Sequence, residues 1–275
     1  MALSPYAGPA ERAWYYTHRV LCAAVLLFLI APILVIMPLS FNAEPYFSYP
    51  MPGLSLRWYE DFFTNERWVL ALKTSIIVAA FTTVIATTLG TLAALGLSRA
   101  SFPARTSIMS VLISPMIVPV IISALGMYFF YTPIGLTNSL PGLTLAHTAL
   151  ATPFVVIVVT ATLTGFDHSL ARAGASLGAD PVRVFRKVIL PLILPGVISG
   201  ALFAFVTSFD EVVVVVFLAG PEQRTLPKQM FSGIREDISP TITAAASMLI
   251  VFAVFMLTTV ELLRRRSERL RGIRS

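Results

Sequence analysis

The stretch ARAGASLGADPVRVFRKVILP, residues 171–191, is a polar interval in a chain that is otherwise rich in apolar residues. Gly178 is placed to end a short helix, because glycine readily adopts the left-handed conformation that follows many helices. Asp180 and Pro181 have the residue types preferred at the N-cap and at the first position of a helix. The pattern therefore predicts two short helices that are joined at Gly178.

The first of these helices is expected to begin at a cap formed by Asp167 or Ser169. Its small and apolar residues fall on one helical face, which lets a neighbour pack closely: Leu170, Ala173, Gly174 and Leu177. Two interpretations follow from these residues alone. The stretch is either an ordinary helical loop between two membrane spans, or a docking element for a cytoplasmic partner.

The surrounding chain has the composition of an integral membrane protein. Of its 275 residues 56% are hydrophobic and only 12% are charged, and the mean hydropathy is +0.82, whereas about 25% of a soluble domain is charged. Six apolar runs have about the 20 residues that a membrane-spanning helix needs. We predict an all-α membrane protein with spans at residues 20–41, 68–97, 108–130, 143–165, 190–218 and 241–263.

The distribution of lysine and arginine predicts the orientation, because cytoplasmic loops carry an excess of these residues. With the N-terminus inside, fourteen basic residues fall on the cytoplasmic side: Arg12, Arg19, Arg99, Arg105, Arg172, Arg183, Arg186, Lys187, Arg264, Arg265, Arg266, Arg269, Arg271 and Arg274. The six others fall outside: Arg57, Arg67, Lys73, Arg224, Lys228 and Arg235. Both termini are therefore expected to be cytoplasmic.

We accordingly divide the chain into three parts. Residues 1–19 form a cytoplasmic N-terminal segment, residues 20–263 a six-helix transmembrane domain that includes the polar loop 166–190, and residues 264–275 a basic cytoplasmic tail. The tail suits contact with anionic membrane lipid. No aromatic stacking platform accompanies it, so we expect no nucleic-acid partner.

The 166–190 loop resembles the Glu-Ala-Ala loop of bacterial ABC importer permeases. In that family Glu-Ala-Ala is followed by three residues, a glycine and an apolar region that closes with Leu-Pro. Here Arg172-Ala173-Gly174 occupies the first place, Gly178 the second and Leu190-Pro191 the last. Residues 71–99 and 152–167 are similar to the family's second and fourth spans, and residues 208–232 resemble the spermidine/putrescine branch. The usual glutamate is replaced by Arg172.

The resemblance implies a type I importer permease, with coupling helices between the fourth and fifth spans. It implies as partners a dimer of ATP-binding cassette ATPase subunits, a second and different permease chain, and an extracytoplasmic solute-binding protein in a bacterial inner membrane. The residues carried over for docking the ATPase subunit are Arg172, Ala173, Gly174, Leu177, Gly178, Ala179, Asp180, Pro181 and Phe185. A contact that depends on the family's glutamate does not transfer to Arg172.

The chain itself lacks the motifs of an ATP-hydrolysing enzyme. It has no G-x-x-x-x-G-K-[ST] phosphate loop, no nucleophile elbow and no H-E-x-x-H pair. The three histidines are scattered and are interpreted as interfacial residues, so no metal site, cofactor or catalytic residue is predicted. ATP hydrolysis is expected in a separate subunit.

An acid pair interrupts the fifth apolar run. A carboxylate at the centre of a spanning helix costs about 2.5–3.5 kcal/mol on insertion scales, so such residues usually face a cavity or a partner. Asp210 and Glu211 are predicted, with Ser208, to mark a translocation path for a small cationic or amino compound. The alternative is a structural ion pair at the outer interface. In a regular helix the two acids point about 100° apart, so only one of them would face the path.

Two other classes of function compete with the importer permease. An ion-coupled secondary transporter also places acids in its spans, but such proteins usually contain internal repeats and none is visible here. A membrane scaffold would need neither the loop nor the acid pair. Polyamines are the first choice of solute, with amino-acid derivatives and opine-like compounds behind them.

Overall fold

The structure is a computed structural model that describes residues 8–98, 104–236 and 238–270, apart from the side chains of residues 260 and 263–270. Within these ranges the regular elements are helices, with one isolated bridge between Asn42 and Leu54. Arg99, Arg271 and Arg274, which the orientation argument used, lie outside the described residues.

Five helices of the described chain are long and apolar enough to cross a membrane. Four of them are α1 (Pro9–Leu39), α3 (Glu66–Leu97), α6 (Leu140–Thr164) and α12 (Pro240–Leu270). The fifth runs from Pro181 to Phe209 and comprises α8 (Pro181–Val184), a π-helical turn (Phe185–Ile189) and α9 (Leu190–Phe209). The first four agree with predicted spans, although α1 begins eleven residues before position 20, and the fifth overlaps the predicted span 190–218.

The remaining predicted span, residues 108–130, is not one straight helix. It consists of α4 (Arg105–Ile117) and α5 (Val120–Tyr131), whose axes bend by 102° at the break. Pro119 at this break has no amide proton to donate to a helical hydrogen bond, and its ring disfavours the helical conformation at Val118. Counted as one broken span, the pair gives a sixth candidate.

The predicted fifth span needs a correction. Residues 190–218 form two helices, because α9 ends at Phe209 and a separate short helix, α10 (Val213–Leu218), follows. The break falls at the acid pair, Asp210 and Glu211. Continuous apolarity concealed it, because the valines after the pair suit either one long helix or a second short one.

The core forms where α3, α6 and α9 pack together, and glycines permit their close approach. A Cβ atom added at Gly90 of α3 would lie 2.7 Å from the Cβ of Val155 on α6. One added at Gly200 of α9 would lie 3.3 Å from the Cα of the same valine, and one at Gly196 would clash with Thr162. Glycines on α3 and α9 thus let both helices approach Val155 of α6, which is fully buried.

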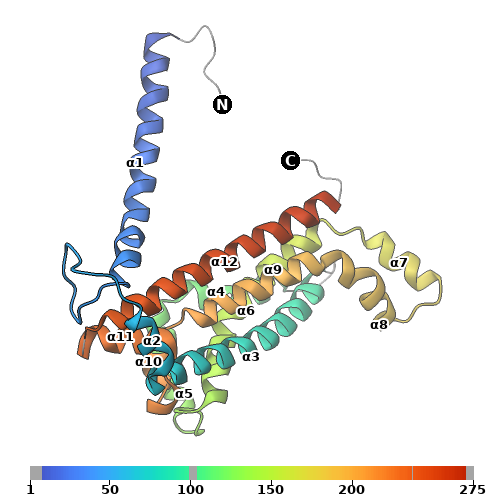
Figure 1. Ribbon diagram of the computed structural model, residues 1–275. Coiled ribbons are helices and arrows are strands. Elements are labelled where there is room, and N and C mark those ends of the chain that lie inside the picture. The colour runs from blue at the N-terminus through green and yellow to red at the C-terminus, as the bar shows by residue number, and fades with distance from the viewer. Residues whose placement is uncertain (1–7, 99–103, 237, 271–275) are drawn as a thin grey trace.

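The connecting elements divide between the two ends of this core (Figure 1). One end carries α2 (Arg57–Thr64), α10, a 3-10 turn (Pro221–Gln223) and α11 (Leu226–Glu236). The opposite end carries α7 (His168–Ser176) and α8. Figure 1 also shows that α1 stands away from the core for most of its length, and none of its residues is buried. The 166–190 loop and the acid pair therefore lie at opposite ends of the molecule.

Candidate functional sites

The 166–190 loop begins with the predicted cap of α7. The carboxylate of Asp167 accepts a hydrogen bond from the Ser169 amide at 2.8 Å and another from the Ser169 hydroxyl at 2.6 Å. These bonds stabilise the ionised form, so they hold the pKa of Asp167 below its usual value. Of the two caps that the sequence allowed, Asp167 is the one that forms.

Gly178 ends α7 as the sequence predicts. Its φ is +82°, in the left-handed region. Its amide donates to the Ala175 carbonyl at 3.0 Å, and the Ala179 amide donates to the Gly174 carbonyl at 3.2 Å. This pair of bonds is the Schellman arrangement, which satisfies the last carbonyls of a helix and reverses the chain.

The second helix starts at the predicted Asp180-Pro181 pair. The carboxylate of Asp180 accepts a hydrogen bond from the Arg183 amide at 2.9 Å, while Pro181 occupies the first helical position. The Arg183 Nε also lies 3.8 Å from the same carboxylate, and both side chains are exposed. Both halves of the loop are thus set by local capping chemistry.

The structure shows what packs on the small face of α7. A Cβ atom at Gly174 would lie 3.4 Å from Val184 and 3.7 Å from Val188, so this part of the face packs against the helix that follows it in the same chain. Leu177, in contrast, is 89% exposed. The predicted face therefore separates into an internal contact at Gly174 and an apolar surface at Leu177.

The other residues predicted for docking divide in the same way. Arg172, Ala173, Gly178 and Pro181 are exposed. Ala179 and Phe185 are half-buried and line an apolar groove of about 690 Å³ between α7, α8 and the adjoining ends of α3 and α6. The turn between α7 and α8 is the part of the loop farthest from the core (Figure 1).

At the opposite end of the core, the two acids have different environments. The Oε1 atom of Glu211 accepts a hydrogen bond from the Val214 amide at 2.9 Å and so caps the start of α10. Asp210 follows the last residue of α9 and is exposed. Within the described part of the chain, its carboxylate has no hydrogen-bond or ion-pair partner. At the break between α9 and α10, Glu211 is therefore held by a hydrogen bond, whereas Asp210 has no partner among the described residues.

Ser208 is buried inside the protein, away from Asp210. Its hydroxyl lies 2.8 Å from Nδ1 of His147 on α6, and both residues are at least 97% buried. The interpretation of His147 as an interfacial residue is therefore wrong. No local pattern indicates this contact, because 61 positions separate the partners.

Lys228 on α11 is a second residue that the sequence did not single out for this end. Its ammonium group donates hydrogen bonds to the carbonyls of Ala219 at 2.8 Å and Val215 at 3.3 Å, which closes the C-terminal end of α10. Partial burial lowers the pKa of Lys228, and the nearby charge of Arg224 lowers it further. Glu211 and Lys228 together hold the two ends of α10.

Comparison with known proteins decides the family. Residues 86–269 match the family described as binding-protein-dependent transport system inner membrane component. The chain belongs to this family. The match confirms the predicted class and favours the importer permease over an ion-coupled secondary transporter.

Individual relatives agree with this assignment. The spermidine/putrescine transport system permease protein PotC of Haemophilus influenzae is 31% identical over 92% of this chain and 98% of its own length. The putrescine transport system permease protein PotI of Escherichia coli is also 31% identical, over 90% of each chain. These relatives are transport permeases, which confirms that the chain is a transport subunit and not an enzyme.

Solved structures establish the fold. A chain from a bacterial ABC transporter involved in import of the acidic polysaccharide alginate superposes with a TM-score of 0.74, covering 94% of this chain and 99% of its own length. Its sequence identity is 16%. At that identity the similarity confirms the predicted all-α permease fold, and it carries no information about the solute.

Proposed function

We propose that this protein is one of two different permease subunits of an ATP-driven, binding-protein-dependent importer of polyamines. The family match and the two 31%-identical polyamine permeases support this function and this solute class. The given sequence contains no phosphate-loop motif, which is consistent with ATP hydrolysis by partner subunits. A solute-binding protein delivers the polyamine on the side opposite to those subunits.

The observation that carries the proposal is the geometry of the 166–190 loop. Two capped helices reverse at Gly178 and project beyond the core, and the exposed side chain of Leu177 lies beside the turn. A partner that covers an apolar side chain in this position removes it from water, which lowers the free energy of the complex. The ATPase subunit is this partner, with the loop and both termini on the cytoplasmic side.

Asp210 is the residue of the acid pair that suits a translocation path. Its carboxylate is exposed at a helix break and has no intramolecular partner among the described residues. An amine cation in transit can therefore pair with it without first displacing a protein group. Glu211 already accepts a hydrogen bond from the Val214 amide, and Ser208 contacts His147 in the interior. These two residues therefore stabilise the helices beside the path and do not contact the solute.

The test is uptake by the complete transporter in proteoliposomes. The chain is reconstituted with its partner permease and ATPase subunits, ATP is enclosed on the ATPase side, and loaded binding protein is supplied on the other side with labelled putrescine or spermidine. The proposal predicts accumulation that requires ATP and the binding protein. Accumulation driven by an imposed ion gradient in the absence of the ATPase subunits would overturn it.

A further inference from the structure

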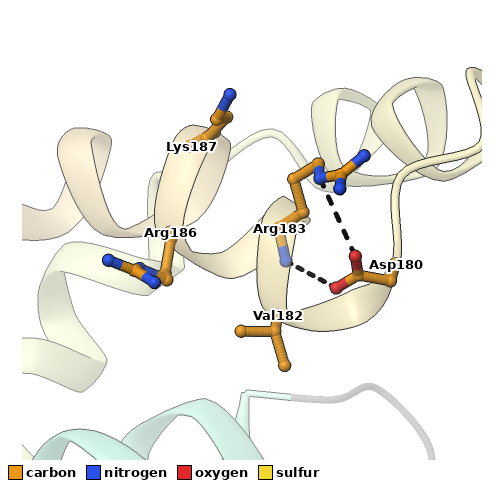
Figure 2. Close-up of a pocket in the computed structure, with 5 residues that line it drawn as sticks. All are labelled: Asp180, Val182, Arg183, Arg186 and Lys187. Carbon is orange, nitrogen blue, oxygen red and sulfur yellow. Dashed lines mark hydrogen bonds and ion pairs between the residues drawn. The ribbon is translucent and has the colours of Figure 1, made fainter.

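A basic hollow lies on the face of α8 and the π-helical turn that does not line the apolar groove. Five residues line it: Asp180, Val182, Arg183, Arg186 and Lys187 (Figure 2). Its volume is about 480 Å³ and it is open to the surroundings. Val182 is 65% exposed and contributes an apolar part to the lining.

The three cations of the hollow are not equivalent. Arg183 is paired with Asp180, as the dashed lines in Figure 2 show. Arg186 and Lys187 are both exposed, and neither has a hydrogen-bond or ion-pair partner within the described ranges of the chain. The hollow therefore carries two uncompensated positive charges on adjacent residues.

The position of these two residues along the helix places them at a particular depth. α9 has 20 residues, which at about 1.5 Å per residue spans the roughly 30 Å of a hydrocarbon core. Arg186 and Lys187 precede Leu190 by four and three residues in a π-helical turn, which rises less per residue than an α-helix, so they lie at most about 4.5–6 Å outside that core. The polar layer on each side of the core is about 5–8 Å thick. In a span that runs along the membrane normal, both cations are thus within the layer of the lipid headgroups.

Asp180 lies farther out. It precedes Leu190 by ten residues, or about 15 Å along the helix, which is beyond the polar layer. The hollow therefore extends from the headgroup layer, where its free cations are, toward the aqueous side, where its charges are paired. This order of charges fits a ligand that approaches from the membrane.

We propose that Arg186 and Lys187 each bind the phosphate of an anionic phospholipid headgroup in the cytoplasmic leaflet, because their side chains point in different directions (Figure 2). The guanidinium of Arg186 can donate two parallel hydrogen bonds to phosphate oxygens, and the ammonium of Lys187 binds phosphate as a point charge. The side on which the headgroup lies rests on the proposed orientation of the importer. The ligand chemistry rests on the hollow itself.

The test measures lipid binding by the purified full chain with native mass spectrometry. Dioleoylphosphatidylglycerol is compared with dioleoylphosphatidylcholine, which has the same acyl chains and no net charge. A basic residue near a membrane surface favours anionic lipid by about 1 kcal/mol, or roughly fivefold. Arg186→Gln and Lys187→Gln should each reduce the preference for phosphatidylglycerol about fivefold, and the double variant should reduce it about 25-fold.

Arg172→Gln is the matched control, because it removes the same charge from an exposed position in the same loop. It should leave the lipid preference unchanged. An unchanged preference in the double variant, or an equal loss in the control, would overturn the proposal. Displacement of the lipid by millimolar inorganic phosphate would also overturn it, because the hollow would then be a site for a free anion.

A parallel measurement separates this proposal from the docking of the ATPase subunit. The double variant should bind the ATPase subunit with wild-type affinity in lipid-free detergent. Loss of that binding, with the lipid preference intact, would assign the hollow to the protein interface and refute the lipid site. Failure of the wild-type chain to bind any ATPase subunit would instead contradict the proposed function, while the lipid comparison would still be decisive for the hollow.

Discussion

The substitution Gly178→Asn separates the internal role of the loop turn from its role in docking. Gly178 has φ +82°, and a Cβ atom at this position would meet nothing within 4 Å. Within the chain, the cost is therefore only that of placing a side chain in the left-handed region. Asparagine is among the residues that tolerate this region best, so we expect a loss of stability of about 1 kcal/mol or less.

A close-packed partner changes this expectation. If the ATPase subunit covers the turn, the open space around Gly178 is filled in the complex, and a new side chain overpacks the contact. Overpacking typically costs about 1–3 kcal/mol, which corresponds to roughly a 5- to 150-fold weaker affinity. The variant should therefore remain folded and lose binding. The assay is the Kd of the ATPase subunit for the immobilised full chain in detergent, with thermal unfolding measured in parallel.

The chain offers a matched control in Gly135, in the turn between α5 and α6. Gly135 has φ +70°, and a Cβ atom there also meets nothing within 4 Å. Gly135→Asn thus has the same backbone cost at a position remote from the loop, and it should leave the affinity unchanged. Wild-type affinity in Gly178→Asn, or an equal loss in Gly135→Asn, would refute the reasoning.

Three further predictions concern the charges and the core. Arg172→Glu, which introduces the residue of the family pattern, should retain transport in the uptake assay because docking depends on the shape of the turn; loss of uptake would show a specific contact of the arginine. Asp210→Asn should reduce polyamine uptake normalised to complex abundance, whereas Glu211→Gln should change it little because glutamine still offers an oxygen to the Val214 amide. Equal uptake in the two variants would remove the distinction between the acids. Gly90→Val should lower the yield of folded protein in gel filtration, since its side chain would clash with the buried Val155, and a wild-type yield would show that α3 and α6 can separate at low cost.

The accuracy of the sequence-based predictions followed the range of the interactions involved. Gly178 and Asp180 were predicted correctly, and Asp167 was one of the two caps predicted for α7, because the hydrogen bonds of a cap join groups only two to five residues apart. The pairing of Ser208 with His147 was missed, because it depends on how α6 and α9 pack. Burial of that pair leaves Asp210 as the exposed residue of the three predicted path residues.

The break between α9 and α10 had a local signal that continuous apolarity concealed. The signal is the acid pair itself, since Glu211 caps the new helix by accepting a hydrogen bond from the Val214 amide, yet the apolar residues before and after the pair suit a single span. Similarly, the small face of α7 predicted a close contact correctly but not its partner. Gly174 contacts Val184 and Val188 of the same chain, and sequence periodicity alone does not distinguish an internal contact from an external one.

Cross-linking from the tip of the loop tests the central claim, that the 166–190 loop docks the ATPase subunit, most directly. Cys22 is the chain's single cysteine, so a Cys22→Ser background allows a unique thiol at Leu177→Cys, which replaces an 89% exposed side chain. We predict that a short thiol-reactive photocross-linker at this position captures the ATPase subunit in the assembled transporter, and that the same reagent at Gly135→Cys does not. Capture of the ATPase subunit from position 135 and not from position 177 would contradict the account.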